Sequence, residues 1–300
     1  MILDNTAELT WKQFIEQPQY KSLPVNEQVI AYNKYLEYIS NLRNSMINYQ
    51  NKGRRRTVPP APGNPVACIE GMDVVFLIDY TGSMGGYING VKSGVLSIVN
   101  TIISRSYGNY RLGLVLFDEY VGDVVGNYGT DIEYTNLPAA QRYTNYNATA
   151  NRKQFITAME VMSNANNSSF TTQLNLLNDA LPLGAGSGTP EPGGIGFQQI
   201  LNGIAGDFRT NVARLVVLIT DAQPGGDDDT YNATDTAFLT SLASTALKQN
   251  IQLLLLTRRN TAPNTEYRIL SDNTNGTYTQ DLSLSVEGIV NSINGICDSN

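Results

Sequence analysis

Three uninterrupted apolar runs dominate the hydrophobic pattern of the chain: DVVFLID (73–79), ARLVVLIT (213–220) and IQLLLLT (251–257). Strands that face solvent on one side alternate polar and apolar residues, whereas continuous runs are typical of parallel strands covered on both faces. Helical patterns follow at about 85–104, 191–205 and 234–248. Together these elements predict an α/β fold with a doubly wound, mostly parallel sheet and helices on both faces.

The remaining pattern predicts the rest of this domain. We expect a strand at 110–118, followed by a Gly-rich, antiparallel hairpin that reaches Tyr134. The segment NRKQFITAMEVM (151–162) predicts a short helix, and residues 163–188 an irregular insertion with one or two helical turns. A short strand at 277–280 and a helix at 285–297 complete the chain.

The N-terminal part has a different pattern. Apolar residues at three- and four-residue spacing predict a helix of about seven turns; they are Tyr32, Tyr35, Leu36, Ile39, Leu42, Met46 and Tyr49. Either the main domain or another protein could cover this stripe. The segment TVPPAPGNP (57–65) is a Pro-rich boundary. We therefore divide the chain into an N-terminal helical anchoring segment (1–56), a linker (57–67) and a domain (68–300).

Composition narrows the function. The chain has 41% hydrophobic residues, 16% charged residues and a net charge of -7, so it can form a core but lacks the basic surface of a nucleic-acid binder. It has no histidine, which excludes His-based triads and imidazole metal sites. No apolar stretch predicts membrane insertion. MILDNTAELTW lacks the features of a secretory signal, so we expect a cytoplasmic protein or one that leaves the cell by another route.

Oxygen-bearing side chains follow the apolar strands. Asp79 ends the first run, with Thr81 and Ser83 on the next turn, and Asp221 follows the run at 213–220. Thr189 lies on a Gly/Pro turn before a helix. In a doubly wound sheet, the loops after the strands meet at one edge, so we expect these five side chains to converge.

Such a set of oxygens suits a divalent cation. Mg²⁺, Mn²⁺ and Ca²⁺ prefer oxygen ligands without nitrogen or sulfur. Hydroxyl groups fill coordination positions without adding negative charge, so the bound ion can still attract a carboxylate. The residues therefore predict a site for Mg²⁺, or alternatively Mn²⁺ or Ca²⁺, that binds an acidic side chain of a partner protein.

The motif DYTGS, with Thr189 in GTPEP and Asp221 in LITDA, resembles the von Willebrand factor type A (integrin I-like) family over roughly residues 70–297. This resemblance implies a Rossmann-like domain with a metal-ion-dependent adhesion site (MIDAS) and a role in adhesion or protein–protein interaction. It implies that Thr81, Ser83 and Thr189 bind the metal directly or nearly so, and that Asp79 and Asp221 bind it directly or through water.

The two cysteines, Cys68 and Cys297, bracket the predicted domain. They could be unrelated thiols, or they could lie within bonding reach because the ends of a compact domain are often close. Their positions are also similar to those in family members whose termini are joined by a disulfide. Whether the pair is oxidised depends on the compartment.

The segment FIEQPQYKSLPVNEQVIAYNKYLEYISNLRN resembles leader segments of tailed-bacteriophage structural proteins. With the Asn-, Tyr- and Thr-rich composition, it favours a non-enzymatic structural protein of a phage virion, in the tail, neck or baseplate. Its N-terminal helix would bind other virion proteins. The alternatives are a cytoplasmic adaptor that docks substrates to a hexameric ATPase, and a surface adhesin.

Overall fold

We analysed a computed structural model of the 300-residue chain. It describes residues 14–36 except 26, 30 and 34, then 68–121, 137–147, 152–179, 181, 183–184, 190–225 and 230–280. Near the C-terminus it describes residues 290, 291, 293, 294 and 297. Among these residues, no helix is long and apolar enough to cross a membrane.

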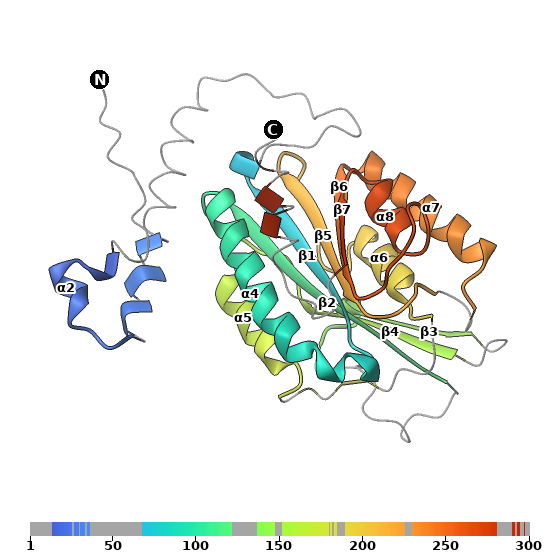
Figure 1. Cartoon of the computed structure of the whole chain (residues 1–300), viewed down its shortest axis with the longest axis horizontal. Helices are drawn as coiled ribbons and strands as arrows, with labels where there is room; N and C mark the ends of the chain where they lie inside the picture. The colour runs from blue at the N-terminus through green and yellow to red at the C-terminus, as the bar shows by residue number, and fades with distance from the viewer. Residues whose placement is uncertain are drawn as a thin grey trace.

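A seven-stranded sheet forms the centre of the protein, in the order β3-β4-β2-β1-β5-β6-β7 (Figure 1). Its strands are β1 (Met72–Asp79), β2 (Tyr110–Val121), β3 (Arg142–Asn147), β4 (Arg152–Glu160), β5 (Ala213–Thr220), β6 (Ile251–Thr257) and β7 (Thr277–Gln280). Strands β2, β1, β5, β6 and β7 are parallel, whereas β4 is antiparallel to both β2 and β3. The predicted mostly parallel α/β fold is confirmed.

Helices cover both faces of this sheet (Figure 1). Helices α4 (Ile88–Arg105) and α5 (Asn167–Leu176) pack on one face, together with Ile293 near the C-terminus. Helices α6 (Gly193–Leu201), α7 (Ala233–Lys248) and α8 (Arg268–Asp272) pack on the other. Successive residues of β1 enter opposite cores, since Val74 and Phe76 join the first and Val75 and Leu77 the second. This two-sided burial explains the continuous apolar runs.

Two expectations about the middle of the chain are wrong. The segment expected as a short helix at 151–162 contains strand β4, which supplies the antiparallel neighbour of β2. The insertion at 163–188, expected to contain only one or two helical turns, contains the 10-residue helix α5. The hairpin expected to reach Tyr134 lies largely outside the described residues, and β2 itself runs on to Val121.

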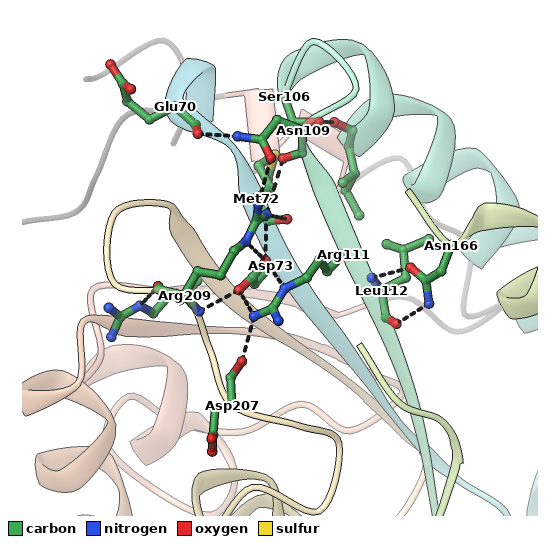
Figure 2. A network of polar contacts seen from close by, with 12 residues as sticks. Glu70, Met72, Asp73, Ser106, Asn109, Arg111, Leu112, Asn166, Asp207 and Arg209 are labelled. Atoms are coloured by element: carbon green, nitrogen blue, oxygen red, sulfur yellow. Dashed lines mark hydrogen bonds and ion pairs between the residues drawn. The ribbon is translucent and has the colours of Figure 1, made fainter. Parts of the chain in front are cut away.

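A buried ion-pair network lies at the end of the sheet where the parallel strands begin (Figure 2). Asp73 of β1 is fully buried and accepts hydrogen bonds from Arg111 Nε at 3.0 Å and Arg209 Nε at 2.8 Å. The backbone N–H of Arg209 donates to the same carboxylate at 2.7 Å. Burial raises the pKa of Asp73, but the hydrogen bonds from Arg111 and Arg209 outweigh it and hold the pKa below its usual value.

The two ends of the domain meet close to this edge. A disulfide joins Cys68, in the 3-10 helix η1 (Cys68–Glu70), to Cys297, with 5.2 Å between their Cα atoms. The sequence left open whether the two cysteines are unrelated thiols or lie within bonding reach. In the structure they are bonded. The bond closes a loop with a sequence separation of 229, so it restricts the unfolded chain strongly.

The described N-terminal residues form a small helical unit that lies apart from the sheet in Figure 1. Phe14 is buried and contacts the rings of Tyr20, Tyr32 and Tyr35, with centroids 4.1, 5.1 and 5.1 Å away. The short helix α2 (Pro18–Lys21) belongs to this unit. Part of the predicted apolar stripe is therefore covered by the N-terminal segment itself. The stripe residues from Ile39 onward and the linker lie outside the described residues.

Candidate metal site at the carboxyl ends of the strands

The centre of the sheet positions the first acidic residue. Asp79 is the last residue of β1, which lies between β2 and β5. The pairing of Ile78 with Ile219 brings the end of β5 alongside. Thr220 and Asp221 therefore lie beside Asp79. Parallel pairing of these two strands is what joins residues more than a hundred positions apart in the sequence.

Four of the five predicted site residues form a connected chain of oxygen atoms. Thr81 Oγ1 donates to Asp79 Oδ1 at 2.7 Å, and the backbone N–H of Thr81 donates to the same oxygen at 3.0 Å. Thr81 Oγ1 lies 3.1 Å from Ser83 Oγ, which donates to Asp221 Oδ1 at 2.9 Å. We call these four residues, Asp79, Thr81, Ser83 and Asp221, the strand-end site. The fifth, Thr189, lies outside the described residues.

The strand-end site runs from the interior to the surface. Asp79 and Thr81 are fully buried, whereas Ser83 is exposed on the 3-10 helix η2 (Gly82–Gly86). The side-chain oxygens of Asp79 are thus fixed by the core, while Ser83 is accessible to a partner. The site therefore has a buried, fixed part at Asp79 and Thr81 and an exposed part at Ser83.

A residue that the sequence reasoning missed orients the buried carboxylate. Thr220 Oγ1 donates to Asp79 Oδ2 at 2.7 Å and accepts from the backbone N–H of Ala222 at 3.1 Å. Both oxygens of Asp79 are therefore held in place. Thr220 could have been found from its position in the sequence, since it immediately precedes Asp221 at the end of a buried strand that is parallel to β1.

Burial perturbs the acidity of this carboxyl group. Removal from water raises the pKa of Asp79 to about 6, an effect opposed by hydrogen bonds from Thr220 and Thr81 and reinforced by the charge of Asp221. At neutral pH the carboxylate is therefore ionised in surroundings that disfavour its charge. A bound cation would remove this penalty.

The oxygens fit a small divalent cation in spacing and in chemistry. Ligands at about 2.1 Å in an octahedron around Mg²⁺ lie about 3 Å from their neighbours, and the oxygen-to-oxygen distances along the site are 2.7, 3.1 and 2.9 Å. The described residues contain no group of three or more His, Cys, Asp or Glu that could hold a metal. A metal here would therefore depend on the hydroxyl groups as well as the two carboxylates.

The loop that leads to Thr189 is attached to the loop that carries Asp221. The backbone N–H of Glu191 donates to Gln223 O at 2.8 Å, and that of Gly225 donates to Glu191 O at 2.7 Å. A bridge between Glu191 and Pro224 has parallel geometry. The two loops therefore form one backbone unit beside the strand-end site.

Tyr267 holds the backbone of Glu191 and Gly193 in this unit, and the sequence did not predict its role. Its hydroxyl donates to Glu191 O at 3.0 Å and accepts from the backbone N–H of Gly193 at 3.0 Å. Burial, with the negative charges of Asp79, Glu191 and Glu119, raises the pKa of Tyr267 well above its usual value, so the hydroxyl stays protonated as a donor. A Cβ on Gly193 would lie 2.2 Å from the Tyr267 hydroxyl, which explains the glycine. No local sequence pattern predicts a contact between residues so distant in the chain.

No protein-family model matches the sequence, and no curated relative matches it. Solved structures do match. The SpRpn10 VWA domain has 16% identity and a TM-score of 0.42, over 75% of this chain and 94% of that one. The open form of the pilus adhesin SpaC from Lactobacillus rhamnosus GG has 16% identity and a TM-score of 0.44, over 82% of this chain and 33% of that one.

A third match is proximal thread matrix protein 1 from the mussel byssus, whose MIDAS motif is occupied by zinc. It has 13% identity and a TM-score of 0.49, over 78% of this chain and 47% of that one. The fold to which this chain is similar is that of von Willebrand factor type A domains.

Proposed function

We propose that this chain is a non-enzymatic, metal-dependent protein-binding protein. Its strand-end site would hold Mg²⁺, or alternatively Mn²⁺ or Ca²⁺, and coordinate an acidic side chain of a partner. The observation that carries the proposal is the continuous chain of oxygens from the buried Asp79 to the exposed Ser83 and on to Asp221.

Each residue of the site would have a defined part in binding. Asp79, fixed by Thr220, would anchor the ion from the interior. Thr81 and Ser83 would contribute neutral oxygens, and Asp221 a second carboxylate from the neighbouring strand. The bound ion would supply a positive centre that accepts a carboxylate of the partner.

Binding is favoured over catalysis by the chemistry of the chain. The sequence contains no histidine, and both cysteines form the disulfide. The usual pairings of a nucleophile with an imidazole base, or of a reactive thiolate, are therefore unavailable. The oxygens of the strand-end site are accounted for by a cation.

A thermal-shift titration tests the metal site directly. We expect Mg²⁺ to raise the melting temperature of the full-length protein, and Ser83→Ala to weaken this response because it removes an exposed ligand oxygen. The matched control is Ser93→Ala, since Ser93 is also exposed but lies on α4 and donates only to Asn89 O at 3.1 Å. Equal responses in wild type and Ser83→Ala would contradict the proposal.

For the biological setting, we propose a phage virion, in the tail, neck or baseplate, with the N-terminal segment bound to other virion proteins. Support comes from the resemblance of that segment to phage leader sequences and from the Asn-rich composition. A pull-down from the native source in Mg²⁺ and in EDTA, read by mass spectrometry, tests this setting. Virion proteins among the captured partners would support it, whereas copurification with a hexameric ATPase would favour the adaptor.

A further inference from the structure

Glu266, just before α8, has a backbone conformation that is unfavourable for its residue type. Its φ angle is 49°, in the left-handed region that glycine and asparagine adopt most readily. Among the described residues with a positive φ that are neither glycine nor asparagine, the others are Tyr107 and Ala165. Such strain persists only where surrounding contacts maintain it, and it is concentrated at functional sites. The contacts of Glu266 therefore point to its role.

The carboxylate of Glu266 connects the loops that follow β5 and β6. Gln223, just beyond Asp221, donates from Nε2 to Glu266 Oε1 at 2.8 Å. Arg259, just beyond the end of β6, donates from Nε to Oε2 at 3.1 Å and from Nη2 to Oε1 at 3.2 Å. Such bidentate pairing fixes the direction of a carboxylate as well as its position. The side chain of Glu266 is therefore held between two loops at the carboxyl ends of parallel strands.

The backbone of Glu266 contacts the other end of the loop between β5 and α7. Its N–H donates to the hydroxyl of Tyr231 at 3.0 Å, and Tyr231 lies just before the start of α7. Glu266 thus holds the loop that carries Asp221 near both of its ends. Because Gln223 O also accepts from the backbone N–H of Glu191 at 2.8 Å, the same cluster supports the backbone unit beside the strand-end site.

We propose that Glu266 is a positioning residue of the strand-end site. Its carboxylate and its backbone N–H hold the loop that carries Asp221, so that the Asp221 carboxylate stays beside Ser83 when a cation binds. The left-handed conformation is maintained because it directs these two groups of Glu266 toward Gln223 and Tyr231. The strain lowers the stability of the metal-free protein and raises its affinity for the metal. This inference rests on the proposed function.

Replacement by glycine separates these two effects. Glu266→Gly relieves the strain and removes the carboxylate, so its melting temperature in EDTA should stay close to that of wild type, because relief of strain offsets the loss of a partly exposed ion pair. Isothermal titration of the full-length protein with Mg²⁺ should show roughly tenfold lower affinity, as is typical when a group that orients a metal site is lost.

Ala165→Gly is the matched control for strain. Ala165 is exposed, has the same φ of 49°, and donates its backbone N–H to Tyr110 O at 2.9 Å, at the opposite end of the sheet. A glycine there relieves a similar strain and keeps the backbone hydrogen bond. This variant should bind Mg²⁺ as wild type does.

Gln223→Met tests the contact from the other side. It keeps a side chain of similar length but removes the amide that donates to Glu266, so Mg²⁺ affinity should fall here too. The double variant Glu266→Gly/Gln223→Met should bind little more weakly than either single variant, because both remove one interaction.

Wild-type Mg²⁺ affinity in Glu266→Gly or in Gln223→Met would overturn the inference. An equal fall in Ala165→Gly would do so as well, since the effect would then follow from any added glycine. A large loss of stability of Glu266→Gly in EDTA would also overturn it, because Glu266 would then serve the fold. If the wild type binds no divalent cation, the proposed function itself fails, and this inference with it.

Discussion

At the residue scale, the strand-end site contains a carboxylate whose negative charge is disfavoured by burial and would be neutralised by a bound cation. The pKa of Asp79 is raised by burial to about 6, so the folded protein holds a proton on this group more tightly than the unfolded chain does. Without metal, the resulting loss of stability begins as pH rises above the unfolded value near 4 and is complete above about pH 6. At neutral pH the cost is on the order of 3 kcal/mol.

Asp79→Asn should therefore have opposite effects with and without metal. In EDTA at pH 7.5 we expect the variant to be at least as stable as wild type, because it carries no buried charge. That advantage should disappear at pH 4. In Mg²⁺ only the wild type should gain melting temperature, and its gain should weaken below about pH 6, where protons compete with the metal for Asp79.

Thermal melts over this pH range, in Mg²⁺ and in EDTA, check both halves of the expectation. A rise in melting temperature with Mg²⁺ in Asp79→Asn that equals the wild-type rise would show that the metal binds elsewhere. A large loss of stability in EDTA would show that the hydrogen bonds to Thr81 and Thr220 matter more than the charge.

Tyr267 is expected to affect metal binding through the loop that contains Glu191 and Gly193. Tyr267→Phe keeps the ring but removes the hydroxyl that holds Glu191 O and Gly193 N–H. We expect Mg²⁺ affinity to fall roughly tenfold, as is typical when a group that orients a metal site is lost. Isothermal titration with Mg²⁺ measures this fall. Tyr110→Phe, at the opposite end of the sheet in β2, should bind Mg²⁺ as wild type does, and equal affinities for both variants would reject this role.

At the element scale, the parallel strands were predictable and the antiparallel strand β4 was not. The bounds expected for β5 and β6 agree with the structure because each strand is a continuous apolar run that is buried on both faces. Strand β4 was mistaken for a helix because Phe155, Met159 and Met162 recur at helical spacing. Its pairing with β2 and β3 outweighs that local preference.

The candidate site was predictable for a related reason. Asp79 and Asp221 each follow a buried strand, and parallel pairing brings such positions to one edge of the sheet. Thr220 and Tyr267 were not predicted, since their roles depend on side-chain contacts across more than 70 residues of sequence. Local patterns identify which groups end a strand, whereas these supporting contacts arise only from tertiary packing.

The ion-pair network connects elements at the far edge of the sheet, where Asp73 links β1 to Arg111 of β2 and to Arg209 (Figure 2). Asp73→Asn should lower the free energy of unfolding by about 3–5 kcal/mol, because it leaves two arginines without their buried counter-charge. Urea unfolding at pH 7 measures this loss. The rise in melting temperature with Mg²⁺ should remain, since the network and the strand-end site lie at opposite ends of β1, and loss of that response would mean that the two ends are coupled.

At the scale of the whole molecule, two units differ in how they are held together. The sheet domain has two cores, and its ends are joined by the disulfide between Cys68 and Cys297. Neither core contains a described residue before Cys68. The N-terminal unit has its own aromatic cluster around Phe14, while Val25 and Val29 remain 71% and 42% exposed. This separation agrees with an N-terminal segment that binds another protein.

Deletion of residues 1–56 should therefore leave a soluble, folded domain. We expect its melting temperature and its response to Mg²⁺ to match those of the full chain, because no described N-terminal residue contributes to the cores or to the strand-end site. Circular dichroism and thermal melts in Mg²⁺ and in EDTA make the comparison. In the pull-down, the truncated protein should lose partners that are retained in EDTA and keep those that require Mg²⁺. Aggregation of the truncated chain would instead show that the N-terminal segment packs on its own domain, and its exposed valines would then need no external partner.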